Sequence, residues 1–239
     1  MNKRIFGLIL AMMVVPITIA PVFAQQSPPI NGSVPPNYTF PRVDNPAYQR
    51  KLNQVKPAQI NAEPILKKTL YVGTNNQFKE PENWAYVNYC GPASTQVALR
   101  ARITNIPSLD SIGQCEYIDP NWGVYMSNVT PCLNSYLNTS FYWTDYAPDS
   151  ATLASRLKSD VDQGYAMLTG VYTSGMGGWS FGTYHIITLF GYDNTSSTNK
   201  KVDYVDTASS IAGYNGLYFN FVSLDNLWWN ISQNNVQAW

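Results

Sequence analysis

The sequence is poor in the residues that usually build metal sites and nucleic-acid surfaces. It contains one histidine and three cysteines among 239 residues, and metal sites generally need clusters of these side chains. Only 13% of the residues are charged, 15 basic residues balance 15 acidic ones, and basic runs do not exceed two residues. We therefore expect no metal, no cofactor and no nucleic-acid partner.

Apolar and aromatic residues, by contrast, are abundant, at 45% and 14% of the chain. This is enough material for one substantial domain with its own core. Because charges are scarce, the polar surface must come largely from Asn, Ser, Thr and Tyr, which is common in exported proteins.

The N-terminus has the order of a secretory signal. A basic "MNKR" precedes the apolar run "IFGLILAMMVVPITIA", and "VFA" ends at Ala24 with small residues at the cleavage positions. We predict a signal peptide over residues 1–24 and a secreted or cell-surface protein. The run is too short and too interrupted by proline for a stable membrane span, and an uncleaved anchor is the alternative.

Residues 25–68 differ in composition from the rest of the chain. Eight of the 16 prolines fall between Gln25 and Pro64, and the segment has neither a helical nor a strand period. We expect it to be extended and poorly packed, with "NPAYQRKLNQV" as at most a short helix. Two interpretations stay open: a linker from the cell surface, or a propeptide that is cut near Lys67–Lys68.

Residues 69–239 are predicted to form one α+β domain. Helical patterns come first and strand patterns follow, an order typical of helices packed on an antiparallel sheet. The helices are expected at 90–103, 108–118, 130–138 and 149–164, the strands at 165–173, 185–193, 202–208 and 217–224, and a last helix at 224–232.

The three cysteines are Cys90, Cys115 and Cys132. Cysteines of an exported protein tend to pair, and an odd number leaves one thiol free. Cys115 and Cys132 have 16 residues between them and lie in similar loop or helix-start contexts. We predict a disulfide between these two, which would contribute about 3 kcal/mol by the loop-entropy model. Cys90 then remains free.

Cys90 lies in "NYCGPAST", directly before a helical pattern. The free N–H groups and the dipole at the start of a helix stabilise a thiolate, which is the reactive form of cysteine. Pro92 suits the first helical turn, and Gly91 would let a substrate backbone approach closely. A buried structural cysteine is the alternative interpretation.

His185, the single histidine, follows a glycine-rich loop and begins an apolar strand. A cysteine nucleophile needs a base that also protonates the leaving amine, and no other imidazole is present. Pairing strands 185–193 and 202–208 places Asp206 roughly opposite His185, where it would orient the ring. Asp203 competes for this role, Asp193 is expected in a turn, and a structural histidine is the alternative.

Four blocks together resemble a known family. "YCGPASTQVAL", "GYAMLTGVYT", "GTYHIITLFGYD" and "VDYVDTAS" are similar to the bacteriocin-processing (double-glycine leader) peptidase-like branch of the papain-like cysteine peptidases, over about residues 70–230. The resemblance implies a papain-like fold with the nucleophile at a helix start packed on an antiparallel sheet. It also implies a Cys90–His185–Asp206 triad and peptide-bond hydrolysis through a thioester.

The same resemblance implies a glutamine shortly before the nucleophile, whose amide donates a hydrogen bond into the oxyanion hole. The nearest upstream glutamine is Gln77, 13 residues before Cys90, and it is the candidate. Asn83 and Asn88 are the alternatives for the same role.

The sequence thus predicts a secreted, monomeric cysteine peptidase that acts on a peptide or protein substrate. An acyl-transferring transpeptidase or crosslinker is an alternative, because an amine can capture the same thioester. A catalytically inactive binding protein of the same fold is another.

Overall fold

The computed structural model describes residues 30–41, 44–55 and 66–239. The predicted signal peptide lies outside these residues. Within them, no helix has both the length and the apolar character that crossing a membrane requires.

A seven-stranded antiparallel sheet forms the centre of the molecule. Along the sheet the strands run in the order β2-β7-β3-β4-β5-β6, and β1 pairs separately with β4. The strands are β1 (Lys67–Thr69), β2 (Thr144–Asp145), β3 (Met167–Tyr172), β4 (Tyr184–Asp193), β5 (Lys201–Val205), β6 (Phe219–Ser223) and β7 (Gln237–Ala238).

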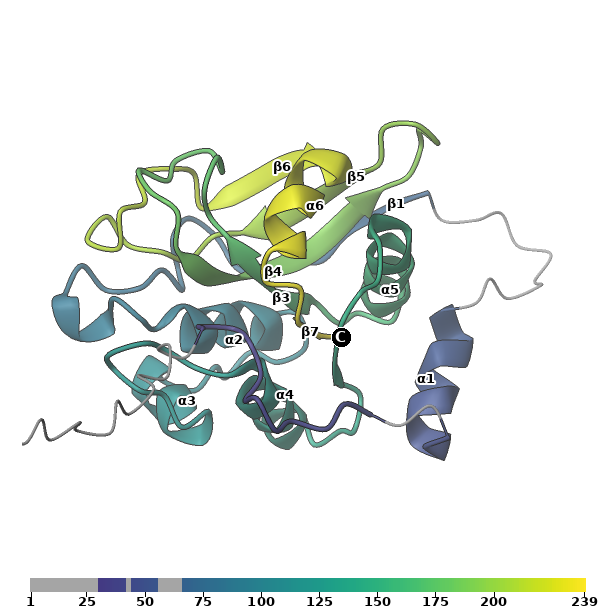
Figure 1. The fold of residues 1–239 in the computed structure, drawn as a ribbon, viewed down its shortest axis with the longest axis horizontal. Coiled ribbons are helices and arrows are strands. Elements are labelled where there is room, and N and C mark those ends of the chain that lie inside the picture. The colour runs from purple at the N-terminus through teal and green to yellow at the C-terminus, as the bar shows by residue number, and fades with distance from the viewer. Residues whose placement is uncertain (1–29, 42–43, 56–65) are drawn as a thin grey trace, which may run out of the picture.

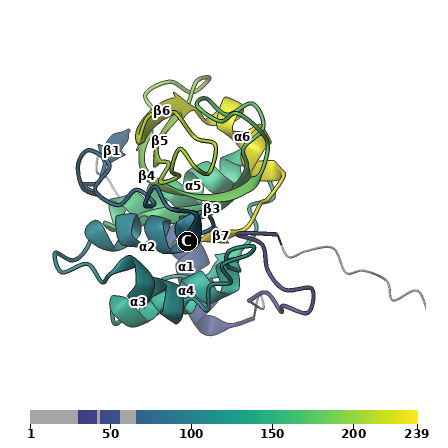
Figure 2. The same cartoon turned by 90° about the vertical axis from the view of Figure 1, so that its left-hand side faces the viewer.

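The helices form two groups around this sheet. Figures 1 and 2 both show α2, α3 and α4 gathered together on one side of the strands. In the second group, α5 packs mainly against β4, and α6 packs against β3. The helices are α1 (Pro46–Val55), α2 (Cys90–Arg100), α3 (Leu109–Cys115), α4 (Met126–Tyr136), α5 (Ser150–Asp162) and α6 (Leu224–Ser232), with a 3₁₀ turn η1 (Trp84–Tyr86). The predicted α+β class is confirmed.

Alternate residues of the central strands enter two different cores. Ile186 and Phe190 of β4 join the core that contains α2 and α4, whereas Ile187 and Leu189 join the core that contains α5 and α6. Because successive side chains of a strand point to opposite faces, both faces of the sheet are buried. Strand β4 therefore reads as a continuous apolar run.

Local signals placed most helices correctly, and α4 is the exception. Helix α5 begins next to the predicted start at residue 149, and the Asp149 side chain caps it by accepting from the Thr152 N–H. Helix α4 begins at Met126, four residues before the predicted start at Thr130, and contains Pro131 in its interior. Met126 and Val129 are fully buried, so core packing outweighs the local cost of the proline.

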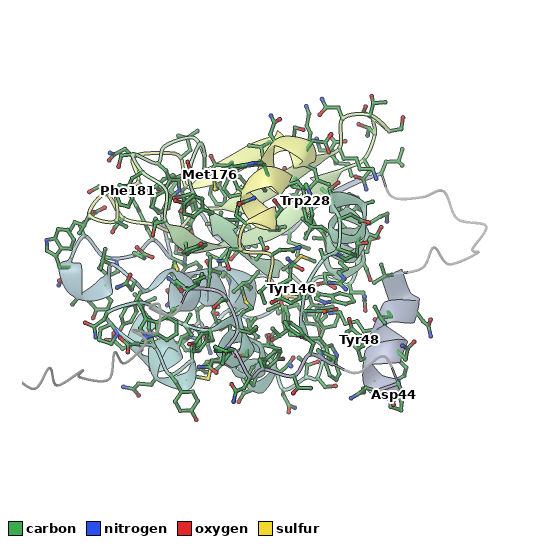
Figure 3. All side chains as sticks on the ribbon, viewed as in Figure 1. Asp44, Tyr48, Tyr146, Met176, Phe181 and Trp228 are labelled. Carbon is green, nitrogen blue, oxygen red and sulfur yellow. A yellow bond between two sulfur atoms is a disulfide. The ribbon has the colours of Figure 1, made fainter. Side chains whose placement is uncertain are left out.

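The segment before the domain is better packed than its composition suggests. The Gly32 N–H donates to the Val124 carbonyl at 2.8 Å, and the Met126 N–H donates to the Ser33 carbonyl at 2.7 Å. Further along, α1 buries Tyr48 (Figure 3) and Lys51. The expectation of a poorly packed segment is therefore wrong for the described residues. These contacts join residues that are far apart in the sequence, and no periodic pattern in the sequence predicts them.

The dibasic pair Lys67–Lys68 belongs to the sheet. Both residues lie in β1, where Lys67 pairs with Asp193 and Lys68 with Tyr192 of β4. A cut after Lys68 would remove two of the three residues of this strand. A processing site that spares the fold would lie upstream of Leu66.

The predicted disulfide is present. Cys115 at the end of α3 is bonded to Cys132 in α4, and Cys90 is a free, buried cysteine. The bridge joins two helices that lie beside α2, so it holds the helical group against the helix that carries Cys90.

Candidate active site

Cys90 is the first residue of α2, and its side chain is only 1% exposed. Tyr89 precedes it without a side-chain cap, which leaves N–H groups of the first turn available to an anion. Pro92 lies in this first turn, as predicted. Gly91 has a packing role instead of the expected substrate contact, because a Cβ there would lie 2.2 Å from the Val124 side chain.

His185 lies at the start of β4 and is 3% exposed. Its Nε2 lies 2.9 Å from Oδ1 of Asp206, which leaves Nδ1 free to face the nucleophile. A ring nitrogen of His185 and Sγ of Cys90 lie within 4.8 Å of one another. The structure therefore brings the predicted nucleophile and base together, although 95 positions separate them in the sequence.

Asp206 follows directly after β5. The ladder between β4 and β5 pairs Thr188 with Val205. Asp206 therefore lies diagonally from His185, whereas the sequence predicted a position roughly opposite it. Residues two apart on a strand share a face, and the carboxylate still reaches the ring. Its other contacts are the Trp179 Nε1–H at 2.8 Å and the Ala208 N–H at 3.1 Å.

These contacts fix the orientation of the imidazole. A carboxylate that accepts from one ring nitrogen holds the tautomer in which the other faces the nucleophile. Burial by itself lowers the pKa of His185, but the Asp206 carboxylate and the Cys90 sulfur raise it, and the pKa ends well above its usual value. A protonated imidazole beside the sulfur favours the thiolate.

The competing carboxylates do not reach His185. Asp203 accepts from the Thr69 hydroxyl at 2.6 Å, on the part of β5 that pairs with Gly191. Asp193 forms an ion pair with Lys67 at 3.1 Å and accepts from the Thr195 N–H in the turn that follows β4. Of the two aspartates of this region, the structure places Asp206 beside His185 and Asp203 beside Thr69.

The structure does not bring Gln77 to Cys90. Gln77 is exposed, and its Oε1 lies over Gly73 of its own loop. Asn83 is exposed, and its side-chain oxygen caps η1 by accepting from the Ala85 N–H. Asn88 borders the Cys90 cavity but donates to the Pro120 carbonyl at 2.8 Å. The amide donor implied by the resemblance is therefore absent from its expected position.

Asn31 contacts the nucleophile, and the sequence contained no signal for it. Its Nδ2 donates to Sγ of Cys90 at 2.9 Å, and its Oδ1 accepts from the Val124 N–H at 3.1 Å. Its main-chain carbonyl accepts from Asn234 at 2.9 Å. Asn31 lies 59 residues before Cys90 in the proline-rich segment, so only the fold reveals this contact.

Glu80 is the second residue that the sequence did not single out. It is buried, and one of its carboxylate oxygens lies within 4.8 Å of both the Cys90 sulfur and a His185 ring nitrogen. These three side chains are a group of potential metal ligands among the described residues. Neither a motif nor a charge pattern in "FKEPENW" predicts this position.

A cavity of about 170 Å³ opens beside Cys90 and His185. The Trp179 ring meets the His185 ring edge-on at 4.9 Å between centroids, shielding the contact with Asp206. Phe181 (Figure 3) is 55% exposed at the rim of this cavity. The lining residues are Asn31, Val87, Asn88, Cys90, Trp179, Phe181, Thr183, Tyr184, His185 and Ala212.

Comparison with known proteins identifies a family for most of the chain. A family model described as "Peptidase_C39 like family" matches residues 69–234. No curated protein matches the chain significantly. Among solved structures, a recombinant stem bromelain precursor is similar with a TM-score of 0.50 at 10% identity, over 87% of this chain and 76% of that one.

Two further solved structures are similar at lower scores. The Amb a 11 cysteine protease of ragweed pollen, in its proform, has a TM-score of 0.47 at 11% identity; the alignment covers 76% of this chain and 66% of that chain. The bromelain protease of Ananas comosus, in complex with the E64 inhibitor, has a TM-score of 0.46 at 8% identity. This alignment covers 74% of this chain and 98% of that chain.

Proposed function

Because the chain belongs to the Peptidase_C39-like family, we propose that it is a secreted cysteine peptidase that hydrolyses peptide bonds with Cys90, His185 and Asp206. The family and the papain-like fold support a cysteine-type peptidase. The observation that carries the residue assignment is the buried chain of contacts from the Cys90 sulfur through His185 to Asp206 at the edge of a cavity.

The proposed reaction proceeds in two steps. The Cys90 thiolate attacks the scissile carbonyl carbon, and His185 gives its proton to the leaving amine, which leaves a thioester on the sulfur. His185 then takes a proton from water, which attacks the thioester and releases the acid. Asp206 keeps the imidazole oriented throughout and stabilises its charged form.

Product analysis separates hydrolysis from acyl transfer. We expect a peptide library incubated with the purified protein to yield fragments that carry new carboxyl termini, with or without an added primary amine. Amine adducts would instead support the transpeptidase alternative, and an unchanged library would favour the binding protein. A Cys90→Ala variant controls for contaminating peptidases, and tandem mass spectrometry identifies the products.

Assignment to the bacteriocin-processing branch is a finer proposal, supported by the "YCGPAS" and "HIITLFGYD" blocks. Peptides with a double-glycine leader can be included in the same library. Preferential cleavage after the two glycines would support this branch, and cleavage without that preference would oppose it.

We also propose that residues 30–41, named here the strap, act as a propeptide and not as a plain linker. The side-chain amide of Asn31 donates a hydrogen bond to the sulfur of Cys90. Gly32 has φ +78°, and a Cβ there would lie 2.8 Å from Ile186, so the strap fits tightly against β4. The Asn31 amide donates to the sulfur that would attack the substrate, so we infer that the strap restricts access to Cys90.

Truncation tests the strap. A chain that begins at Asn45 retains α1 but loses residues 30–41, and we expect a thiol-directed probe to label its Cys90 faster than in the full chain. A closed state favoured by about 1.4 kcal/mol would slow labelling about tenfold. Equal rates in the two proteins would contradict the proposal. Faster labelling combined with loss of peptidase activity would instead mean that Asn31 takes part in the reaction.

A further inference from the structure

Glu80 is a buried carboxylate that the proposed reaction does not use. Its side chain is 2% exposed. Its backbone N–H donates to the Thr207 carbonyl at 2.7 Å, and its Oε2 accepts from the Ser209 N–H at 3.3 Å. Its Oε1 is buried and has no hydrogen-bond partner among the described residues. A buried polar atom without a partner in a folded protein requires an explanation, and the binding of an ion is one.

Two other types of metal ligand lie close to Glu80. One of its carboxylate oxygens, the Cys90 sulfur and a His185 ring nitrogen all lie within 4.8 Å of one another, and all three side chains are buried. Carboxylate, thiolate and imidazole are the protein ligands of Zn²⁺, at bond lengths of about 2.0–2.3 Å. Tetrahedral geometry at these bond lengths separates two ligand atoms by roughly 3.3–3.8 Å. Small side-chain rotations would therefore bring the three atoms around one ion.

The hydrogen bond to Asp206 orients His185 as a metal ligand. Nε2 of His185 lies 2.9 Å from Oδ1 of Asp206, so Nδ1 is the nitrogen that faces Cys90. Metal-binding histidines usually donate their other ring N–H to a carboxylate or a carbonyl, which fixes the tautomer and the ring orientation. The contact that serves the proposed peptidase thus also supplies the supporting carboxylate that a metal-bound imidazole needs.

The types of ligand and their charges favour zinc over calcium or magnesium. The Cys90 thiolate and the Glu80 carboxylate would be two buried negative charges, and one divalent cation neutralises both. Thiolate and imidazole suit Zn²⁺, whereas Ca²⁺ and Mg²⁺ prefer oxygen ligands. Three protein ligands leave a fourth position of a tetrahedral ion open. Cys90 and His185 line the cavity from which an ion and a water molecule can enter.

We propose that Glu80, Cys90 and His185 form a Zn²⁺ site that reversibly blocks the nucleophile. The ion accepts electron pairs from Sγ, from Nδ1 and from one oxygen of Glu80, and the protons that it displaces leave to water. The sulfur then has no free electron pair with which to attack a carbonyl carbon. The site does not depend on peptidase activity, and only its inhibitory consequence rests on the proposed function. The sequence predicted no metal, because positions 80, 90 and 185 form no cluster in the chain.

Zinc binding to the full chain, without a polyhistidine tag, tests the site directly. We expect isothermal titration calorimetry to give one equivalent of Zn²⁺ per chain, and Ca²⁺ not to bind at this site. X-ray absorption at the zinc edge should show one sulfur at about 2.3 Å among nitrogen and oxygen neighbours at about 2.0–2.2 Å. Either the absence of stoichiometric binding or a zinc environment without sulfur would overturn the proposal.

Glu80→Gln tests the third ligand. The variant keeps the size of the side chain and an oxygen that can accept from Ser209, but it loses the carboxylate. We expect its Zn²⁺ affinity to fall by at least about 10–100-fold, because even the loss of a residue that supports a ligand has this effect. Glu82→Gln is the matched control, because Glu82 is exposed and holds Ser210 of the same loop, and its affinity should equal that of the wild type.

Two results with these variants would overturn the role of Glu80. One is a wild-type affinity in Glu80→Gln. The other is an equal loss in Glu80→Gln and Glu82→Gln, which would show that displacement of the loop and not the missing ligand causes the loss. The calorimetry and X-ray absorption of the wild type still test the site if a variant does not fold.

The inhibitory consequence has a separate measurement. Free Zn²⁺ at about 100 times its Kd leaves about 1% of the sites empty, so a thiol-directed probe should label Cys90 about 100-fold more slowly. A chelator should restore the rate. An unchanged rate in the zinc-loaded protein would overturn the block. If zinc binds and protects Cys90 but the zinc-free protein cleaves no peptide, the peptidase proposal fails and the zinc site stands.

Discussion

Replacing Cys90 by alanine is expected to abolish peptide hydrolysis, and His185→Ala to lower kcat by on the order of 10⁴–10⁶-fold, as for other nucleophile–base pairs. The two side chains act as one unit, because the sulfur attacks and the imidazole moves the proton. Removing either should therefore cost about as much as removing both. Steady-state hydrolysis of a cleavable peptide measures the effect, after titration of the active thiol in the wild-type protein.

The chain offers a matched control for this prediction. Asp206→Asn should lower kcat by about 10⁴-fold, because it disturbs the hydrogen bond that holds the His185 tautomer. Asp203 lies on β5, three residues before Asp206, and accepts a hydrogen bond from Thr69. Asp203→Asn should therefore leave kcat nearly unchanged. Equal losses in Asp203→Asn and Asp206→Asn would contradict the assignment of the triad.

Replacing Lys51 by methionine is expected to destabilise the protein by about 3–5 kcal/mol at neutral pH, the usual cost of leaving one partner of a buried ion pair alone. Lys51 on α1 lies 3.2 Å from Asp160 on α5, and both side chains are almost fully buried. The ammonium also donates to the Phe141 carbonyl at 3.0 Å. Denaturant unfolding at pH 7, monitored by tryptophan fluorescence, measures the loss.

Two further variants test the cause of this effect. Lys51→Met combined with Asp160→Leu should recover most of the stability, because no unpaired charge remains. Lys158 and Asp162 form an ion pair on the surface of the same helix, and Lys158→Met should cost under about 1 kcal/mol. A single Lys51→Met variant as stable as the wild type would show that α1 does not depend on this pair.

The pH dependence of the Lys51→Met deficit has a known sign. Burial raises the pKa of Asp160 to about 6 even though Lys51 lowers it, and removing Lys51 raises it further. At low pH Asp160 becomes neutral in the variant, so no buried charge lacks a partner. The deficit should therefore be smallest at and below pH 6, where Asp160 is neutral in both proteins, and grow as the pH rises above 6. It should stop growing near pH 8, where the pKa of Lys51, lowered by burial, lets the wild-type ammonium lose its charge.

Features that depend on near neighbours in the chain were predictable from the sequence. The start of α5 at Asp149, the spacing of Leu153 and Leu157, and the apolar run of residues 185–193 are local patterns, and α5 and β4 were predicted correctly from the sequence. The odd number of cysteines, the spacing of Cys115 and Cys132 and their similar sequence contexts indicated that these two pair. These predictions succeeded because capping, periodicity and cysteine parity act over a few residues or do not depend on geometry.

The environment of the sulfur was decided by the tertiary structure. Gln77 occupies the expected region of the chain but lies near Gly73 and does not line the cavity beside Cys90. Glu80 and Asn31, in contrast, lie close to the Cys90 sulfur, and their segments show no catalytic pattern. Asp206 contacts His185 from a diagonal position across β4 and β5. The predicted strands did not give this register.

Residue types, their order and the lone histidine thus indicated the class of fold and the candidate nucleophile and base. The other polar side chains close to Cys90 come from a loop and from the proline-rich segment. Their positions depend on contacts across 10 to 59 residues of chain, which no local propensity encodes.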